Sequence, residues 1–215
     1  MAHPTDPRGF RLTIKKDWGS VWHNERRFKK LLHEDIAIRK FLRNRLKSAG
    51  LADIVIKRSI NEVRIKITVA KPGLVIGRGG AGIEELKKAL AGMVSGKLYL
   101  DVEEEKKPDL NAKLIAEGIA QRVERRYPYK RAVTQAIEKV KEAGAKGVKI
   151  AIAGVLSGAS SISRTEKKSW GVIPTSTMRA NVDFAKATAF TKYGTIGVKV
   201  WIYKPEEDKR AKGKK

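Results

Sequence analysis

The sequence contains no cysteine, and this absence excludes disulfide bonds and thiolate chemistry. Histidine is scarce as well: the three histidines, His3, His23 and His33, lack the spacing of metal ligands, so we expect no metal site. No apolar run approaches the roughly 20 residues of a membrane-spanning helix. A chain without cysteine fits a reducing compartment, so we expect a cytoplasmic location. Without a spanning segment, we also expect no membrane partner.

Acidic residues are few compared with basic ones. Lys and Arg number 47 against 23 Asp plus Glu, which gives a formal charge of +24 over 215 residues. Self-repulsion at such a charge is relieved by a polyanion, from which lysine and arginine displace condensed counterions. Nucleic acid is therefore the first candidate partner, and an anionic membrane surface is the second.

A glycine-rich segment at residues 74–83 follows a strand of strict apolar–polar alternation at residues 63–69 and precedes a helical pattern. Without Cβ atoms, a phosphate backbone can approach the main chain, and the N–H groups that open the next helix favour an anion. Gly77, Arg78, Gly79 and Gly80 match the GxxG loop of a KH domain, which clamps about four nucleotides of a single strand. We predict that this loop binds RNA.

A second motif uses the same glycines. Gly77, Gly79 and Gly82 also fit GxGxxG, the dinucleotide fingerprint, and Asp101 lies at about the right distance for a ribose contact. That fingerprint needs a strand that ends at the first glycine, whereas residues 72–73, Pro-Gly, end the strand early here. The pattern favours a KH domain and leaves two alternatives, an oxidoreductase that binds nicotinamide and a glycine turn without a ligand.

The elements around the loop have the order of a type II KH domain, which we place at residues 21–105. A basic helix between residues 22 and 48 precedes strands at 53–58 and 63–69, and a short helix, the loop, a longer helix and a strand at 98–102 follow. The cationic outer face of the first helix, at residues 29–47, supports a third hypothesis, a peripheral membrane protein. That hypothesis predicts sedimentation with anionic vesicles.

Residues 109–205 predict a second α+β domain. Two amphipathic helices are followed by strands at 148–152, 160–168, 180–184 and 196–202, the pattern of two helices packed on a four-stranded antiparallel sheet. A proline corner separates the helices and carries Arg125, Arg126, Lys130 and Arg131, for which we predict contact with a nucleic-acid strand. Residues 1–20 predict an irregular basic arm, and residues 206–215 a charged mobile tail.

Six motifs occur in order along the chain: PRGFRL at 7–12, LVIGRGG at 74–80, GAKGVK at 144–149, ISRTE at 162–166, RANVD at 179–183 and YGTIGVKVWI at 193–202. On these motifs the chain resembles the ribosomal protein S-three family of the bacterial small subunit along nearly its whole length. The resemblance implies a non-enzymatic structural constituent of the subunit head, located on the ribosome, without a cofactor or small-molecule substrate. Its implied partners are ribosomal RNA, messenger RNA and neighbouring head proteins.

The resemblance also implies a place at the messenger RNA entry channel, where basic residues of the helix corner take part in unwinding. Lys130 and Arg131 match the first two of these residues, and the third falls on Thr134, which is uncharged. Charge and motif position further predict a set of ribosomal RNA contacts in the arm and the second domain: Arg11, Lys15, Lys16, Arg164, Lys167, Lys168 and Arg179.

Overall fold

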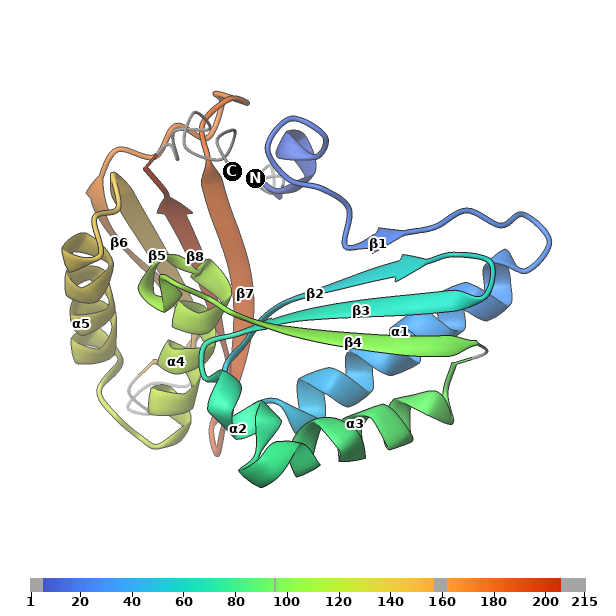
Figure 1. Ribbon diagram of the computed structural model, residues 1–215. Helices are drawn as coiled ribbons and strands as arrows, with labels where there is room; N and C mark the ends of the chain where they lie inside the picture. The colour runs from blue at the N-terminus through green and yellow to red at the C-terminus, as the bar shows by residue number, and fades with distance from the viewer. Residues whose placement is uncertain (1–5, 95, 157–161, 206–215) are drawn as a thin grey trace. The chain divides into compact units, whose positions relative to one another are not determined.

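The computed structural model describes residues 6–94, 96–156 and 162–205, which belong to two units (Figure 1). One unit is Asp17–Pro108. The other combines Met1–Lys16 with Asp109–Lys215, so the described part of the N-terminal arm belongs to the same unit as the C-terminal domain. The tail expected at residues 206–215 lies outside the described residues.

The first unit contains a mixed sheet in the order β1-β2-β3-β4, in which only β2 and β3 are antiparallel. Its strands are β1 (Ser20–Val21), β2 (Leu51–Arg58), β3 (Glu62–Val69) and β4 (Lys97–Glu104). Its helices are α1 (Phe28–Arg45), α2 (Pro72–Ile76), the 3₁₀ turn η2 (Arg78–Gly80) and α3 (Ala81–Ala91). This order of elements confirms the predicted type II KH arrangement.

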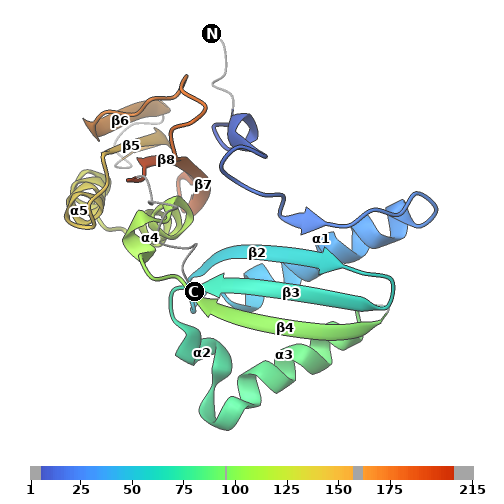
Figure 2. The same ribbon diagram turned by 45° about the horizontal axis from the view of Figure 1, so that its top comes forward.

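Alternation along β3 determines which face of this sheet is covered. Val63, Ile65 and Ile67 are almost fully buried, whereas the Arg64 and Lys66 side chains lie on the opposite face. Helices α1 and α3 cover the apolar face (Figure 2). From these helices the core receives Ile38, Leu42, Leu86 and Leu90. Burial of these aliphatic side chains stabilises the unit by about 1.5–3 kcal/mol each.

The second unit is an antiparallel sheet in the order β6-β5-β8-β7 with α4 and α5 on one face (Figures 1 and 2). Its elements are α4 (Ala112–Glu124), α5 (Tyr129–Glu142), β5 (Gly147–Gly154), β6 (Arg164–Gly171), β7 (Val182–Thr191) and β8 (Gly194–Tyr203), with the 3₁₀ turns η1 (Gly9–Arg11) and η3 (Pro108–Leu110). Two helices on a four-stranded antiparallel sheet confirm the predicted α+β fold.

Two strands of this sheet, β6 and β7, differ most from the predicted ranges. Strand β7 runs to Thr191 rather than ending at residue 184, because the alanine-rich segment 185–189 pairs with β8 up to a tight turn. Alanine has a low strand propensity, so pairing with a neighbour rather than local composition sets this boundary. Strand β6 begins at Arg164, and part of the predicted range, residues 160–161, lies outside the described residues.

Within the described ranges, none of the helices has the length and the apolar composition needed to cross a membrane.

Candidate nucleic-acid interface

The GxxG loop joins α2 to α3 through a backbone that only glycine adopts readily. Gly77, Gly79 and Gly80 have positive φ angles of 70°, 62° and 85°. A Cβ atom added at Gly79 or Gly80 would meet no atom within 4 Å, so a ligand can reach the main chain. No side chain caps α3. The N–H of Ala81 donates to the carbonyl of Arg78, and the Arg78 side chain is exposed at the start of the helix, where an anion is favoured.

The same geometry rejects the dinucleotide alternative. The element that ends at Gly77 is helix α2, whereas the fingerprint requires a strand there. Gly82, the third glycine of the pattern, has a packing role instead: a Cβ atom at this position would lie 2.5 Å from the carbonyl oxygen of Val75. Glycine at this position lets α3 begin directly against α2.

The corner between α4 and α5 is built on a strained residue. The N–H of Tyr127 donates to the carbonyl of Arg122 (2.9 Å) and the N–H of Arg126 donates to that of Val123 (2.9 Å), which together form a Schellman motif. Its left-handed position is occupied by Arg126, with φ of 61°, where glycine is usual. A left-handed conformation costs a non-glycine residue about 1–2 kcal/mol. The chain retains this arginine at an energetic cost, and strained residues of this kind cluster at functional sites.

Cations surround this corner, all of them with exposed side chains: Arg125, Arg126, Lys130 and Arg131. The guanidinium of Arg131 lies 5.9 Å from the ring centroid of Tyr127, a cation–π contact that orients it. On β6, Lys168 donates to the Thr134 hydroxyl (2.8 Å). Its ammonium group therefore lies beside Thr134, the uncharged residue of α5 at which the resemblance implies a basic one. At the start of α5, the Tyr129 hydroxyl donates to the Glu166 carboxylate (2.8 Å).

Arg11, one of the predicted ribosomal RNA contacts, is inside the protein. It is 1% exposed, and its guanidinium donates only to main-chain carbonyls of its own unit. The acceptors are Pro7 (2.9 Å), Pro174 (3.0 Å), Thr175 (3.2 Å), Thr177 (2.8 Å) and Ala180 (2.7 Å). With no exposed donor left, Arg11 fastens the arm to the second unit, and we omit it from the RNA contacts proposed below.

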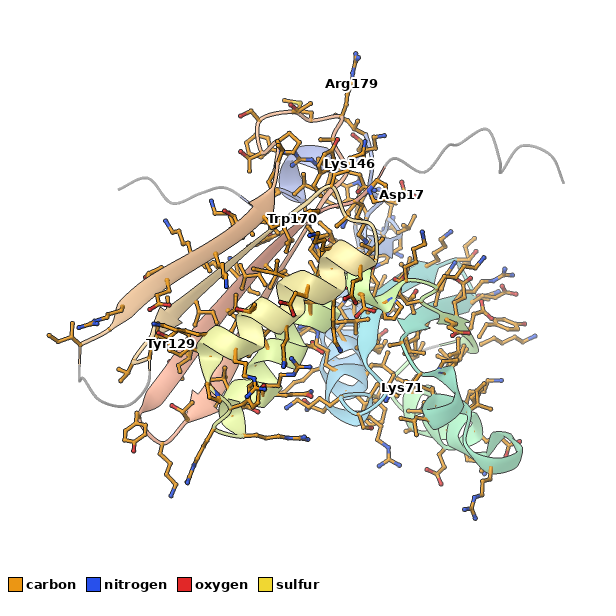
Figure 3. The ribbon with its side chains drawn as sticks, turned by 90° about the vertical axis from the view of Figure 1, so that its left-hand side faces the viewer. Asp17, Lys71, Tyr129, Lys146, Trp170 and Arg179 are labelled. Atoms are coloured by element: carbon orange, nitrogen blue, oxygen red, sulfur yellow. The ribbon has the colours of Figure 1, made fainter. Side chains whose placement is uncertain are left out.

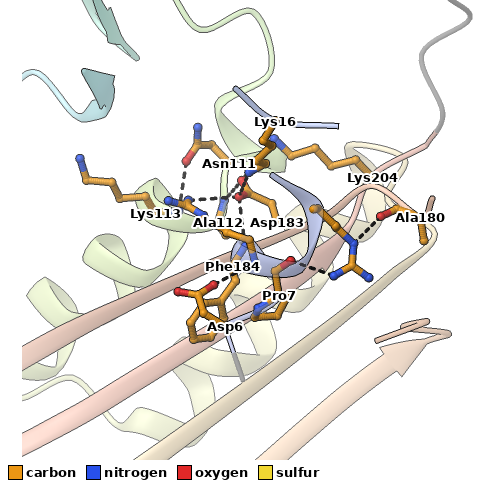
Figure 4. A network of polar contacts seen from close by, with 12 residues as sticks. Asp6, Pro7, Lys16, Asn111, Ala112, Lys113, Ala180, Asp183, Phe184 and Lys204 are labelled. Atoms are coloured by element: carbon orange, nitrogen blue, oxygen red, sulfur yellow. Dashed lines mark hydrogen bonds and ion pairs between the residues drawn. The ribbon is translucent and has the colours of Figure 1, made fainter. Parts of the chain in front are cut away.

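Lys16, a second predicted contact, is held by the same internal network (Figure 4). Its ammonium pairs with the Asp183 carboxylate (2.5 Å), which also pairs with Arg8 (3.1 Å) and Lys204 (3.3 Å). The main-chain N–H groups of Ala112 and Phe184 donate to this carboxylate as well. We call Asp183 with its three cations and Arg11 the arm clasp. It explains why an arm expected to be irregular is docked on the second unit.

The arm clasp strongly perturbs two ionisable groups. Burial alone would raise the pKa of Asp183, but the charges of Lys16, Lys204 and Arg8 outweigh it, so the pKa is far below its ordinary value. Burial lowers the pKa of Lys16, and the repulsion of Arg8 and Lys204 adds to this effect against the attraction of Asp183. The carboxylate therefore remains charged, while three cations compete for it.

The remaining predicted contacts lie at different places on the second unit. Arg164, Lys167 and Arg179 are exposed, and Figure 3 shows the Arg179 side chain pointing away from its loop. Lys15 is also exposed, on the arm. Because neighbouring strand residues point to opposite faces, Lys167 and Lys168 are separated: Lys168 lies on the side of α5, and Lys167 lies on the face opposite α4 and α5.

Two family models match the chain. One, described as KH domain, matches residues 37–110, and the other, described as Ribosomal protein S3, C-terminal domain, matches residues 119–202. Small ribosomal subunit protein uS3 of Persephonella marina is 48% identical over 209 residues, covering 96% of this chain and 92% of that protein. The uS3 proteins of Lactobacillus delbrueckii subsp. bulgaricus and Halalkalibacterium halodurans are 46% and 45% identical over 206 residues, covering 96% of this chain and 92% and 94% of those proteins.

The KH fold, the open GxxG loop and these matches define an RNA-binding ribosomal protein with a KH domain. These matches identify a structural protein rather than an enzyme, as the resemblance implied. The chain belongs to the uS3 family of small ribosomal subunit proteins. It is a structural constituent of that subunit, and the resemblance drawn from the sequence motifs is confirmed.

Proposed function

We propose that this protein binds ribosomal RNA in the head of the small subunit, contacts neighbouring head proteins, and lines the channel through which messenger RNA enters. In this proposal the GxxG loop, Gly77–Gly80, brings main-chain N–H groups and Arg78 to an RNA backbone. Arg164, Lys167 and Arg179 contact ribosomal RNA, and so does Lys15. The exposed side chains of these residues support the assignment. The protein would act in the cytoplasm, on the ribosome.

The corner between α4 and α5 is the part that would hold incoming message. Arg125, Arg126, Lys130 and Arg131 form an exposed cationic edge, and Lys168 supplies from β6 the positive charge that Thr134 does not carry. Any unwinding would be passive: a cationic edge favours the single strand by neutralising its phosphates, while translocation supplies the work. The strained conformation of Arg126 is the observation that carries this assignment, because the fold itself would be more stable with glycine there.

Replacing Arg126 by glycine is expected to stabilise the protein and to weaken RNA binding. Glycine removes the left-handed strain, but it also raises the conformational entropy of the unfolded chain. The net gain in the free energy of unfolding is therefore up to about 1 kcal/mol. Loss of one phosphate contact lowers the slope of log affinity against log salt by about 0.7 for single-stranded RNA. At about 0.1 M salt this corresponds to roughly fivefold weaker binding. Urea unfolding and fluorescence anisotropy with a single-stranded RNA measure the two effects.

Arg125→Gly is the matched control. It removes the same side chain from the preceding residue, whose φ is −78°. Glycine relieves no strain there and should destabilise the protein by about 0.5–1 kcal/mol. If Arg126→Gly also destabilises the protein, or if it leaves RNA affinity unchanged, the proposed role of this corner is wrong.

A further inference from the structure

The face of the second sheet that lies opposite α4 and α5 carries one lysine on each strand. We call this surface the open face: Lys149 on β5, Lys167 on β6, Lys186 on β7 and Lys199 on β8. The register places these lysines on the side opposite the apolar residues that pack under the helices. None of the other residues of the four strands that point to the open face is acidic. All of this charge is therefore of one sign.

Three of these lysines lie in one row across the sheet. Lys186 is directly opposite Lys199, and Ala151 separates Lys199 from Lys167. At about 4.8 Å between neighbouring strands, Lys186 and Lys199 are roughly 5 Å apart and Lys167 roughly 10 Å further along the row. Like charges directly opposite destabilise a sheet, and among the described residues no salt bridge compensates them. A row of this kind fits an external polyanion whose charges repeat.

Aromatic rings lie beside this row and hold lysines over them. The Trp201 and Phe184 rings are 5.0 Å apart and almost buried in the sheet surface. The Lys149 ammonium lies 5.6 Å from the Trp201 ring centroid, and that of Lys186 lies 5.7 Å from the Phe184 ring centroid. These contacts restrict the two side chains near the sheet and lower the entropy lost when they bind an anion.

A groove of about 560 Å³ opens next to these rings, between the sheet and the docked arm. The sheet contributes Trp201, the arm contributes Phe10, and the segment between β6 and β7 contributes Ile173 and Met178. Phe10 and Met178 are each 52% exposed. Lys149 and Lys167 lie at the same groove. Apolar and aromatic walls with ammonium groups beside them suit a nucleobase whose phosphates stay outside, since base–aromatic contacts tolerate any base.

We propose that the open face is a second RNA-binding surface, which binds phosphates through Lys167, Lys186 and Lys199 and receives one unpaired nucleotide in the groove. This inference rests on the proposed function, because it assumes that the protein binds RNA in its assembly. It adds a surface on the other side of the sheet from α5, so a different RNA segment is engaged. The arm forms one wall of the groove, which gives its docking by the arm clasp a role in binding.

The test compares the full-length chain with a variant in which Lys167, Lys186 and Lys199 are glutamine. The probe is a labelled RNA hairpin with one unpaired nucleotide, 4-thiouridine, and affinity is measured over a range of salt concentrations. Loss of three phosphate contacts should lower the log–log slope by about two or more, which at about 0.1 M salt is on the order of a hundredfold weaker binding. Irradiation should crosslink the unpaired nucleotide to a peptide that contains Phe10 or Met178.

Controls keep the outcome interpretable. Lys106, Lys107 and Lys139, which are exposed and are not among the open-face lysines, are changed to glutamine in a matched variant that should bind nearly as the wild type does. The open-face variant should unfold at the same urea concentration as the wild type or a higher one, since like-charge repulsion is removed. A lower unfolding midpoint would show that the lysines stabilise the fold, and it would overturn the inference.

Two further results distinguish this inference from the proposed function. If the open-face variant binds RNA as the wild type does while Arg126→Gly weakens binding, the open face is not an RNA site and the corner assignment stands. If neither variant differs from the wild type in RNA affinity, the open-face inference and the corner assignment are both wrong. Phosphatidylglycerol vesicles are the last probe: if the open-face lysines are needed for vesicle binding and not for RNA binding, the surface binds lipid and the inference is overturned.

Discussion

Replacing Asp183 by asparagine is expected to destabilise the second unit by about 3–5 kcal/mol, the range for removing one partner of a buried ion pair. The carboxylate is almost fully buried and accepts hydrogen bonds from Arg8 and Lys16 and from two main-chain N–H groups, and it also pairs with Lys204. An amide at this position leaves three cations close together with no counter-charge. Their repulsion should expel the arm, which also exposes the acceptors of the buried Arg11 guanidinium.

Hydrogen exchange of the β7 and β8 amides measures this loss in the second unit alone, and limited trypsin digestion near Lys15 reports release of the arm. Glu138→Gln, a neutralisation at an exposed position of α5, is the control and should change stability by no more than about 0.5 kcal/mol. Unchanged protection of β7 and β8 in Asp183→Asn would show that the arm clasp does not stabilise this unit.

The same carboxylate predicts a pH dependence. The pKa of Asp183 is lowered in the folded protein from an ordinary value of 3.8, so the unfolded chain takes up the proton first as the pH falls. The contribution of this group to stability is therefore complete above about pH 4–5 and is lost progressively below that range. Wild-type protein should lose protection of β7 more steeply than Asp183→Asn between about pH 4 and pH 2. Parallel curves for the two proteins would contradict this assignment.

Replacing Arg78 and Gly79 by aspartate is expected to weaken RNA binding strongly. The change removes the cation of the GxxG loop and places two carboxylates where the RNA backbone would lie. Each like-charge contact costs about 1 kcal/mol at 4 Å in water, so affinity should fall about tenfold or more. The fold should persist, because a Cβ at Gly79 meets no atom within 4 Å and aspartate tolerates its left-handed conformation.

Lys106→Asp with Lys107→Asp is the control for this variant, since it changes the net charge by more while leaving the loop intact. If general charge were the cause, this control would bind RNA more weakly than the loop variant. An equal affinity for the loop variant and the wild type, with the far-UV circular dichroism of both unchanged, would remove the GxxG loop from the RNA interface.

Local patterns in the sequence were enough to predict both sheets and the helices that cover them. Alternation such as that of residues 63–69 places every second side chain on the core face, and this periodicity does not depend on distant contacts. The boundary of β7 was missed because residues 185–189 have little strand propensity and pair only through β8. The sequence predicts the GxxG loop because a cluster of glycines marks a backbone with positive φ angles, and the structure has such angles at Gly77, Gly79 and Gly80.

The arm and the open face could not be predicted in the same way. Most of the groups that Arg11 and Asp183 bind lie far from them in the sequence, and nothing in the local pattern distinguishes a buried arginine from an exposed one. Lys186 and Lys199 read as ordinary outward residues of two strands, and only the register shows that they are opposite each other. A signal was nevertheless present: the outward positions of these strands contain lysine without any acid.

The central claim is that this protein holds RNA on the small subunit through its cationic corner, and crosslinking to message tests it most directly. Small subunits that carry the full-length chain would be programmed with messenger RNA bearing a photoreactive nucleotide ahead of the decoding site. The account predicts that the chain co-sediments with the subunit and that the message crosslinks to a peptide from residues 125–131. A chain that is absent from purified subunits, or message that crosslinks only to other proteins, would contradict it.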